Sequence, residues 1–341
     1  MDIQQKVTMK DIAVAANVSI ATVSHVINKS RFVKKETADK VLGIIKEKKY
    51  KTGQLKSSLK YKGFANKSIG VIVNDSSNPL LATLIKNIEQ SANAEGYNLI
   101  VCNSSRDPKK DVENINSLIK RKVDGFIICS SSEDIQYYDN ISKFDMPAVL
   151  IERKIEGLDR DIVWGDHYNA AIEVVDYLAG LGHSKIAYMH KDISLYQSQL
   201  RLKGFMDGLK KNNIDPDEDL ILRGGGFWPQ DGYIEIQKIF YSDNIPTAII
   251  AFNDLLAMGL IRAIQDRNLS VPDDFSVIGA DNLFFSDYTY PRLTTVTYKK
   301  KDIAQNAVML LIERIDGKKG KTTEISLPLR LIIRESTGKA G

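Results

Sequence analysis

Several polar side chains are suited to bind a hydroxylated small molecule. Asp281 and Asn253 directly follow strand-like runs, and Arg201 adds a forked set of donors that suits a diol, a carboxylate or a phosphate. Ligands of open parallel sheets bind beyond the carboxyl ends of strands, so these positions fit a binding cleft. Two simpler alternatives stay open: Asp281 can pair with Arg201, and Asn253 can cap the helix that begins at Asp254.

No residue set predicts catalysis. His167, His183 and His190 are scattered, GxSxG and HExxH motifs are absent, and glycines 224–226 lack the Lys-Ser/Thr of a phosphate loop. Cys102 and Cys129 each lie in a strand-like apolar run, which favours buried thiols over a disulfide or metal site. We therefore expect no catalytic residue, metal ion or cofactor, and His183 is expected to be a structural partner.

Composition indicates a folded protein with two or three domains. The 341 residues are 43% apolar and 26% charged. The longest apolar runs, such as 69–73 and 248–252, are far shorter than the ~20 residues of a membrane-spanning helix. The mostly polar N-terminus has no apolar signal-peptide core. We expect a cytosolic protein without membrane contact.

Charge is concentrated at one end. Residues 1–63 carry fourteen Lys and Arg residues against five acidic ones, a net charge of +9, and the remaining 278 residues carry −5. A basic end of this size is typical of nucleic-acid binding. The alternative, a solvated lysine-rich tail, would show no regular spacing of apolar residues.

The basic end has the spacing of three short helices. Thr8 and Asp11 form a capping-box pattern, Asn17 can turn the chain in a left-handed conformation, and Ser19 can cap the next helix. A tight turn after the first of three helices predicts a helix-turn-helix unit, whose second helix reads base edges in the major groove. The second helix should bury Val23, Val26 and Ile27, and the third, about 36–49, should bury Ala38, Val41, Leu42 and Ile45.

Residues 7–28 resemble the N-terminal signature of the lactose-repressor (LacI/GalR) family of bacterial transcription regulators, most of all its purine-repressor branch. The resemblance implies that Ile20, Ala21 and Thr22 face the bases. His25 can hydrogen-bond a purine N7 or a guanine O6, where many relatives carry Arg, or it can be surface filler. The other expected DNA contacts are Thr8, Ser19, Ser24, Asn28, Lys34, Lys35 and Thr37.

Residues 51–67 form a polar, basic linker with one short helical piece. In the resembling family this piece is a hinge helix that inserts a leucine into the minor groove, and Leu59 occupies that position. Residues 52–53 depart from the usual Pro-Asn start. Lys56 replaces a small Ala and can reach a phosphate instead. A merely flexible linker is the alternative.

From residue 68, strand-like and helical runs alternate. The alternation predicts parallel sheets covered on both faces, and ~270 residues exceed one comfortable core. The fold class is α/β: an N-terminal all-α helix-turn-helix domain plus a two-lobed domain of Rossmann-like parallel sheets. Strands are expected at 69–74, 98–103, 125–129, 148–152, 186–190, 220–223, 248–252 and 277–280.

Motifs of the same family recur at 123–125, 278–282 and 291–295, so the resemblance spans almost the whole chain. It implies a periplasmic-binding-protein-like fold with three crossovers between lobes and the ligand in the cleft. Residues 165–166 replace a frequent Asp-Asn type pair. We expect a DNA-binding domain at 1–50, a linker at 51–67, and an effector-binding and dimerisation domain at 68–341, with lobe 1 at about 68–165 and 297–328 and lobe 2 at about 166–296 and 329–338.

The resemblance also bears on the effector. Phe227 occupies an aromatic position where a ring can pack on a sugar or base, with a core role as the alternative. Leu80 and Leu81 stand where purine-binding members carry an aromatic pair, and Leu195 lies near the position of an arginine that contacts the purine. A sugar or sugar phosphate is therefore favoured over a purine. The expected effector set is Leu80, Leu81, Leu195, Gln197, Arg201, Phe227, Trp228, Asn253 and Asp281.

The expected function is a ligand-responsive bacterial transcriptional regulator, a repressor, that binds double-stranded operator DNA of near-palindromic sequence as a homodimer. The chain ends without the leucine heptads that make tetramers, which favours a dimer. The effector can act as inducer or corepressor. A cytosolic small-molecule-binding protein and a sugar- or nucleotide-converting enzyme are the alternative classes.

Overall fold

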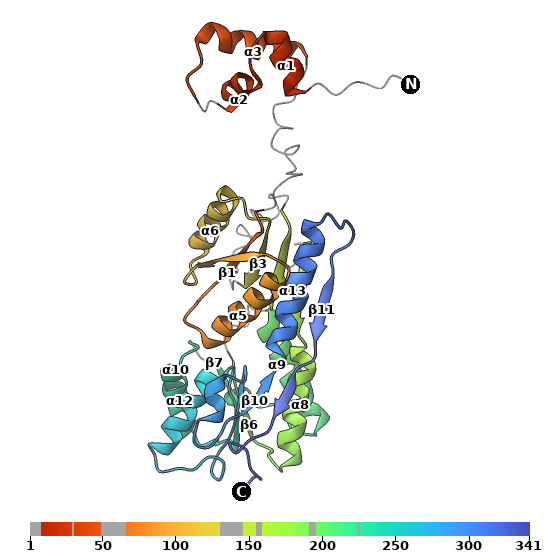
Figure 1. Ribbon diagram of the computed structural model, residues 1–341. Helices are drawn as coiled ribbons and strands as arrows, with labels where there is room; N and C mark the ends of the chain where they lie inside the picture. Colours follow the sequence, from red (N-terminus) through yellow and green to blue (C-terminus); the bar gives the residue numbers. More distant parts are fainter. Residues whose placement is uncertain are drawn as a thin grey trace. The chain divides into compact units, whose positions relative to one another are not determined.

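The computed structural model describes residues 8–28, 31–48, 66–129, 146–154, 159–190, 196–223 and 226–341. The chain forms two compact units, divided between Ala65 and Asn66 (Figure 1). Lys56, Leu59 and Leu195 lie outside the described residues, and so does the expected hinge helix.

The N-terminal unit consists of α1 (Met9–Ala16), α2 (Ile20–Asn28) and α3 (Lys35–Glu47). The capping box before α1 is confirmed: the Asp11 N–H donates to Thr8 Oγ1 at 3.3 Å, and the Thr8 N–H donates to Asp11 Oδ2 at 2.8 Å. Asn17 ends the helix with a φ of 54°, the expected left-handed turn. The helix-turn-helix arrangement therefore begins as predicted.

The three helices share one small apolar core. The expectation that Leu42 is buried is wrong, because its side chain is 49% exposed. Val41 and Ile45 are four residues apart and share the inner face of α3, whereas the next position is rotated away from it. The core residues are Ile12, Ala13, Ala16, Val23, Val26, Val41 and Ile45.

In the described part of the C-terminal unit, the strands form two six-stranded sheets. The first has the order β11-β5-β4-β3-β1-β2, and all its paired strands are parallel. Its strands are β1 (Ser68–Val73), β2 (Asn98–Asn103), β3 (Gly125–Cys129), β4 (Ala148–Ile151), β5 (Asp161–Gly165) and β11 (Glu324–Leu327).

The second sheet has the order β12-β10-β9-β8-β6-β7, in which only β12 runs antiparallel to its neighbour among the described strands. Its strands are β6 (Ile186–His190), β7 (Ile221–Arg223), β8 (Ala248–Ile250), β9 (Ser276–Ala280), β10 (Thr294–Thr297) and β12 (Arg330–Ile332).

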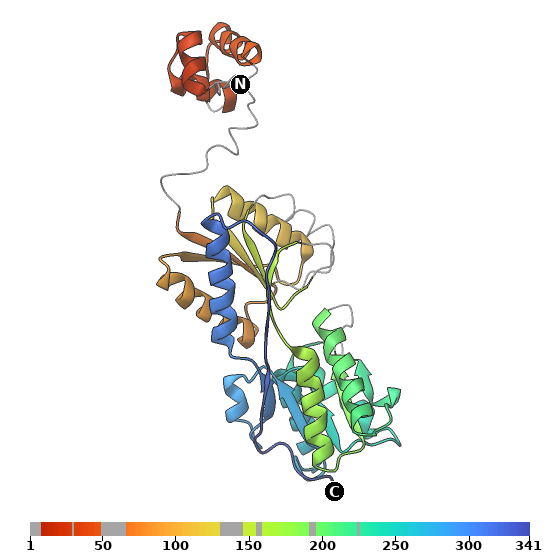
Figure 2. The same cartoon turned by 90° about the vertical axis from the view of Figure 1, so that its right-hand side faces the viewer.

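Helices cover both faces of each sheet, which confirms the expected α/β fold class. On the first sheet, α5 (Pro79–Ala94) and α13 (Lys300–Ile315) pack on one face and α6 (Pro108–Lys120) on the other (Figure 2). We call this layered body lobe 1. None of the helices in the described residues is long and apolar enough to cross a membrane.

Lobe 2 is the body around the second sheet. One face packs against α8 (His167–Gly180) and α9 (Tyr196–Lys211). The other packs against α10 (Pro229–Glu235), α11 (Gln237–Phe240) and α12 (Asp254–Gln265), and two 3₁₀ turns are added, η2 (Glu218–Leu220) and η3 (Phe284–Asp287). In the described ranges the chain passes between the lobes after β5, β10 and β11, so the cleft between the sheets is framed by three connections.

Candidate functional site

The first turn of α2 presents the expected base-reading residues. Ser19 Oγ accepts a hydrogen bond from the Thr22 N–H at 3.0 Å and lies 2.9 Å from Thr22 Oγ1, so Ser19 caps this helix as predicted. Ile20 is 46% exposed and His25 is half-buried. The side chains of Ala21, Ser24 and Asn28 are outside the described set. This end of α2 combines exposed apolar surface with short hydroxyl groups.

The first turn of α3 is basic and lacks a side-chain cap. Lys34 occupies the cap position without a side-chain hydrogen bond to the helix. Lys34 and Lys35 are exposed, and Thr37 is half-buried. Free backbone N–H groups at a helix start attract anions, and two lysines add to that attraction. This end of the helix is suited to hold a phosphate.

A cleft of about 890 Å³, counted with its solvent-open mouth, lies between the two lobes. Seven of the nine expected effector residues line it: Leu80, Leu81, Gln197, Arg201, Phe227, Asn253 and Asp281. The remaining lining residues are Asn74, Asn78, Leu84, Arg106, Cys129, Ile151, Glu152, Arg153, His167, Phe252 and Tyr298.

Asp281 offers the cleft an unengaged carboxyl group. It follows β9 with a φ of 109°, and within the described ranges its carboxylate has neither a hydrogen bond nor a salt bridge. Burial raises the pKa of Asp281 to about 8, and the nearby Asp254 carboxylate adds to the rise. The alternative in which Asp281 pairs with Arg201 is therefore not what the structure contains.

Arg201 is instead held by lobe 2. Its Nε donates to His167 Nδ1 at 3.1 Å, and its Nη1 donates to the Phe252 carbonyl at 2.8 Å. His167 Nε2 lies 2.6 Å from Glu152 Oε2 of lobe 1. These contacts fix the guanidinium at the wall of the cleft.

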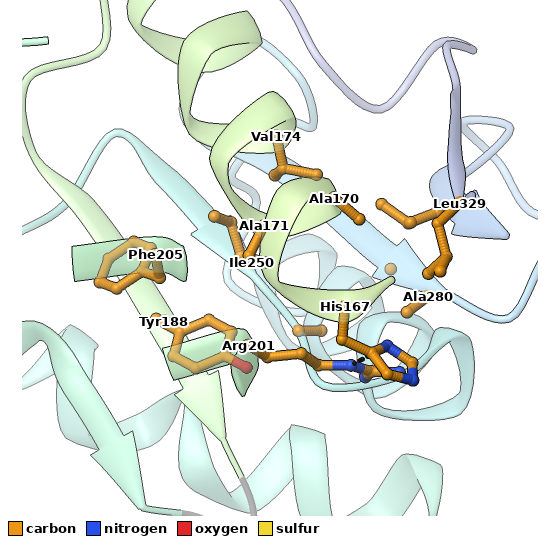
Figure 3. A pocket seen from close by; sticks show the side chains of 13 residues that line it. His167, Ala170, Ala171, Val174, Tyr188, Arg201, Phe205, Ile250, Ala280 and Leu329 are labelled. Carbon is orange, nitrogen blue, oxygen red and sulfur yellow. Dashed lines mark hydrogen bonds between the residues drawn. The ribbon is translucent and has the colours of Figure 1, made fainter. Parts of the chain in front are cut away.

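A smaller apolar pocket lies on the other side of His167 and Arg201. Figure 3 shows these two side chains at one end of it, joined by their hydrogen bond. Phe205 and Tyr188 also line it, and within the described part of the chain the buried Tyr188 hydroxyl has no partner. Burial raises the pKa of Tyr188 to about 12.

Asn253 lines the cleft and also caps a helix. Its Oδ1 accepts from the Leu256 N–H at 2.8 Å at the start of α12, and its Nδ2 donates to the Phe227 carbonyl at 3.2 Å. The capping alternative is thus realised. The Phe227 ring faces the cleft and packs on the lobe 2 core, so its two alternatives coexist, and the Arg106 guanidinium lies 4.4 Å from its centre.

The expectation that Trp228 lines the cleft is wrong. Trp228 is absent from the lining residues. It is the N-cap residue of α10, and its backbone N–H donates to Asp231 Oδ2 at 2.9 Å. Of these two neighbouring aromatic residues, Phe227 is the one that faces the cleft.

Sequence reasoning found Leu80 and Leu81 of lobe 1 but missed its polar residues. Asn74, Arg106 and Glu152 follow β1, β2 and β4, so the rule that found Asp281 would have found them. At Gly165, a Cβ would lie 2.6 Å from Leu329 Cδ1, the end of a flexible side chain that would have to shift.

The remaining histidine and cysteine side chains bear on metal binding and on packing. No group of three His, Cys, Asp or Glu side chains in the described ranges is placed to hold a metal ion. Both cysteines are free thiols, and burial raises the pKa of Cys129 to about 12. His183 is a structural partner, with Nδ1 2.8 Å from Thr247 Oγ1 and Nε2 3.1 Å from Ser276 Oγ.

Two family models match the chain. The one for bacterial regulatory proteins of the lacI family covers residues 8–53, and that for a periplasmic binding protein-like domain covers residues 175–337. The crystal structure of an Enterococcus faecium LacI family transcriptional regulator with bound ribose is 30% identical, with a TM-score of 0.72 over 80% of this chain and 100% of that one. The structure of a lac repressor dimer bound to operator and an anti-inducer is 26% identical, with a TM-score of 0.72 over 98% and 100% of the two chains.

Similarity to a functionally named protein extends over nearly the full length. The HTH-type transcriptional repressor PurR of Mannheimia succiniciproducens is 34% identical over 333 residues, which are 97% of this chain and 99% of that one. Such repressors are not enzymes, and the match includes the helix-turn-helix unit as well as the cleft. The chain belongs to the lacI family of bacterial regulatory proteins and is a transcriptional repressor with an effector-binding domain.

Proposed function

We propose that the chain binds a near-palindromic operator as a homodimer in the bacterial cytoplasm, under the control of a sugar or sugar phosphate bound between the lobes. The proposed domain limits are 1–50, 51–67 and 68–341, with the lobe limits given above. In this proposal Ile20, Ala21, Thr22 and His25 contact bases. The other proposed DNA contacts are Thr8, Ser19, Ser24, Asn28, Lys34, Lys35, Thr37, Lys56 and Leu59.

The unengaged Asp281 carboxyl in a cleft shared with Arg201 carries the effector proposal. A protonated carboxyl group can donate to one hydroxyl and accept from a neighbouring one, and a guanidinium can donate to a hydroxyl or phosphate oxygen. Arg106, which also pairs with Asp75 at 3.3 Å, and Arg153 add two guanidinium groups from lobe 1. The site therefore suits a polyol that carries an anionic group.

The walls of the cleft favour a sugar over a purine. Leu80 and Leu81 are aliphatic, so they offer no ring for stacking on a base. The Arg106 guanidinium lies 4.4 Å from the centre of the Phe227 ring, and the centre of the Phe252 ring lies 5.7 Å from it. These two groups already occupy space around Phe227. The ribose bound to the Enterococcus regulator supports a sugar, whereas the PurR names of relatives make a purine the competing outcome.

An exposed aromatic group on lobe 2 supports the homodimer. Phe284 and Tyr288 are 66% and 82% exposed, and the Phe284 and Phe285 rings lie 3.8 Å apart. Clustered exposed aromatic side chains are typical of protein interfaces. The lac repressor with a similar fold was solved as an operator-bound dimer. A two-fold dimer would explain a near-palindromic site.

A thermal-shift screen with D-ribose, D-ribose 5-phosphate, guanine and hypoxanthine tests the effector. A sugar ligand should raise the melting temperature of the wild type and not of Asp281→Ala, whereas Asp176→Ala, on the surface of lobe 2, should respond like the wild type. Stabilisation by a purine alone would contradict the sugar proposal. Selection from random duplexes, with and without the stabilising ligand, then tests the operator. Lack of any sequence preference would contradict DNA reading.

A further inference from the structure

We propose that Glu152 and His167 are positioning residues for effector binding: Glu152 of lobe 1 orients His167 of lobe 2, and His167 orients the guanidinium of Arg201. The inference rests on the proposed function, because that function gives Arg201 its role in the cleft. The inference extends the proposed function, because it connects the position of Arg201, a ligand-binding group, to the opposite lobe.

Hydrogen-bond direction fixes the state of the imidazole. The Nε–H of Arg201 can only donate, so His167 Nδ1, 3.1 Å away, must be the unprotonated acceptor. The proton of a neutral ring is then on Nε2, from which it is donated to Glu152 Oε2 at 2.6 Å. His167 is 2% exposed, so water has little access to replace either partner. The relay runs in one direction, from Arg201 through His167 to Glu152.

The carboxylate end of the relay is anchored in lobe 1. Glu152 follows β4 with a left-handed φ of 57°, and its N–H donates to the Val163 carbonyl at 2.9 Å. Its Oε1 accepts from the Gly165 N–H at 3.1 Å. A Cβ at Gly165 would lie 3.4 Å from Glu152 Oε1, so the carboxylate packs directly against this glycine.

The other end is anchored in lobe 2. His167 is the first residue of α8, where the chain has just left β5, and Arg201 is tied to the Phe252 carbonyl as well as to the imidazole. The Glu152–His167 hydrogen bond therefore crosses the boundary between the lobes. A movement that lengthens it removes the acceptor of a buried N–H and frees the ring to reorient. Arg201 placement and lobe arrangement are thus linked, so a ligand that needs Arg201 in this position favours this arrangement.

The first test is the tautomer of His167 in the full chain labelled with ¹⁵N-histidine. The four histidines are assigned by single replacements. We expect the long-range ¹H–¹⁵N spectrum of His167 to show a bare Nδ1 and a protonated Nε2, and Glu152→Ala to replace that pattern by averaged tautomers. A protonated Nδ1 in the wild type, or a pattern indifferent to Glu152→Ala, would overturn the inference.

The second test reports on the boundary between the lobes. Trp164 of β5 stacks on Tyr196 of α9, with 5.3 Å between ring centres and 22° between planes. Trp228→Phe leaves Trp164 as the sole tryptophan. In that background, His167→Phe should increase acrylamide quenching of Trp164. His167→Gln, which keeps one acceptor and one donor, should not.

Lys211→Met is the matched control, because it removes a surface ion pair with Asp176 inside lobe 2. Equal quenching in His167→Phe and Lys211→Met would count against the relay, and so would His167→Gln behaving like His167→Phe. Circular dichroism melts of every variant verify that folded proteins are compared.

Calorimetry with D-ribose 5-phosphate measures the effect on ligand binding. His167→Phe should weaken binding by roughly tenfold, the equivalent of one hydrogen bond to a charged group, with most affinity retained in His167→Gln. Equal affinities in both variants would contradict a positioning role. If the wild type binds no sugar, the sugar proposal fails while the tautomer and quenching results still decide the relay.

Discussion

The hydroxyl oxygens of Ser19 and Thr22 lie 2.9 Å apart at the start of α2. Ser19 Oγ also accepts from the Thr22 N–H, so it caps the helix while contacting a residue proposed to read bases. One hydroxyl thus has a folding role and a proposed phosphate-binding role. Variants that keep the cap but change its charge can separate the two.

Ser19→Ala should lower the free energy of unfolding of the N-terminal unit by about 1 kcal/mol, because the α2 cap is lost. Ser19→Asp should restore stability, since Asp caps as well as Ser, yet should weaken binding to all duplexes because its carboxylate repels phosphates. Chemical denaturation and fluorescence anisotropy measure the two effects. If Ser19→Asp binds DNA with wild-type affinity, Ser19 does not lie close to the phosphate backbone of the DNA.

Thr22→Ala and His25→Ala should relax sequence preference, with about 1–3 kcal/mol lost on the selected operator and little lost on random DNA. The double variant Lys34→Ala/Lys35→Ala should instead weaken binding to both duplexes alike. The slope of log affinity against log salt concentration should fall by the equivalent of about two phosphate contacts. Anisotropy titrations at several salt concentrations distinguish them. Lys46→Ala, near the opposite end of α3, is the control for loss of positive charge. Equal losses on both duplexes for every variant would refute the division of roles.

Eight strands were predictable from apolar runs, whereas β5, β10, β11 and β12 were not. The edge strand β11 alternates exposed and half-buried residues and is only four residues long. Two threonines of β10 are fully buried, and hydrogen bonds satisfy their hydroxyls: Thr295 Oγ1 donates to Asp254, and Thr294 Oγ1 accepts from the Arg334 N–H at 2.9 Å. Such pairings join residues far apart in the chain, so no local pattern reveals them.

The polar residues at strand ends of the cleft were predicted only where the strand-end rule was applied. Asp281 and Asn253 follow strands of lobe 2, and the corresponding ends in lobe 1 hold Arg106 and Glu152. The partners of His167 could not be inferred, because they depend on the turn after β4 and on the packing of α9 against α8. Sequence gives the edge of the sheet at which side chains gather, and tertiary packing decides which of them meet.

Arg201→Ala and Asp281→Ala should each abolish the effect of the effector on operator binding, because each removes a polar group that lines the cleft. Operator affinity without effector should be unchanged, since the N-terminal unit is untouched. Anisotropy with labelled operator, with and without effector, measures both quantities. Asp176→Ala is the control for loss of a surface charge on lobe 2. An undiminished response in both cleft variants would remove the assigned site.

The contribution of Asp254 and Asp281 to stability should fall as pH rises from about 4 to about 8. Burial raises the pKa of Asp254 to about 6 and that of Asp281 to about 8, from 3.8. Over that range the native state binds more protons than the unfolded state, so deprotonation favours unfolding. Above pH 6 the slope depends mainly on Asp281, at most about 1.4 kcal/mol per pH unit. Urea denaturation at stepped pH should show a flatter profile for Asp281→Asn than for Asp266→Asn, a surface control. Identical profiles would mean that Asp281 is ionised throughout.

Tyr288→Glu should convert the homodimer to a monomer. Tyr288 is 82% exposed and its ring lies 6.4 Å from that of Phe284, so a charge there disrupts the exposed aromatic group without reaching the core. Sedimentation velocity should show the smaller species, and operator affinity should fall because each half-site is then bound alone. Ile333→Glu, a 58% exposed apolar position of lobe 2 outside that group, should remain dimeric. A dimeric Tyr288→Glu with wild-type operator affinity would mean that the aromatic group contacts something other than a second copy of the chain.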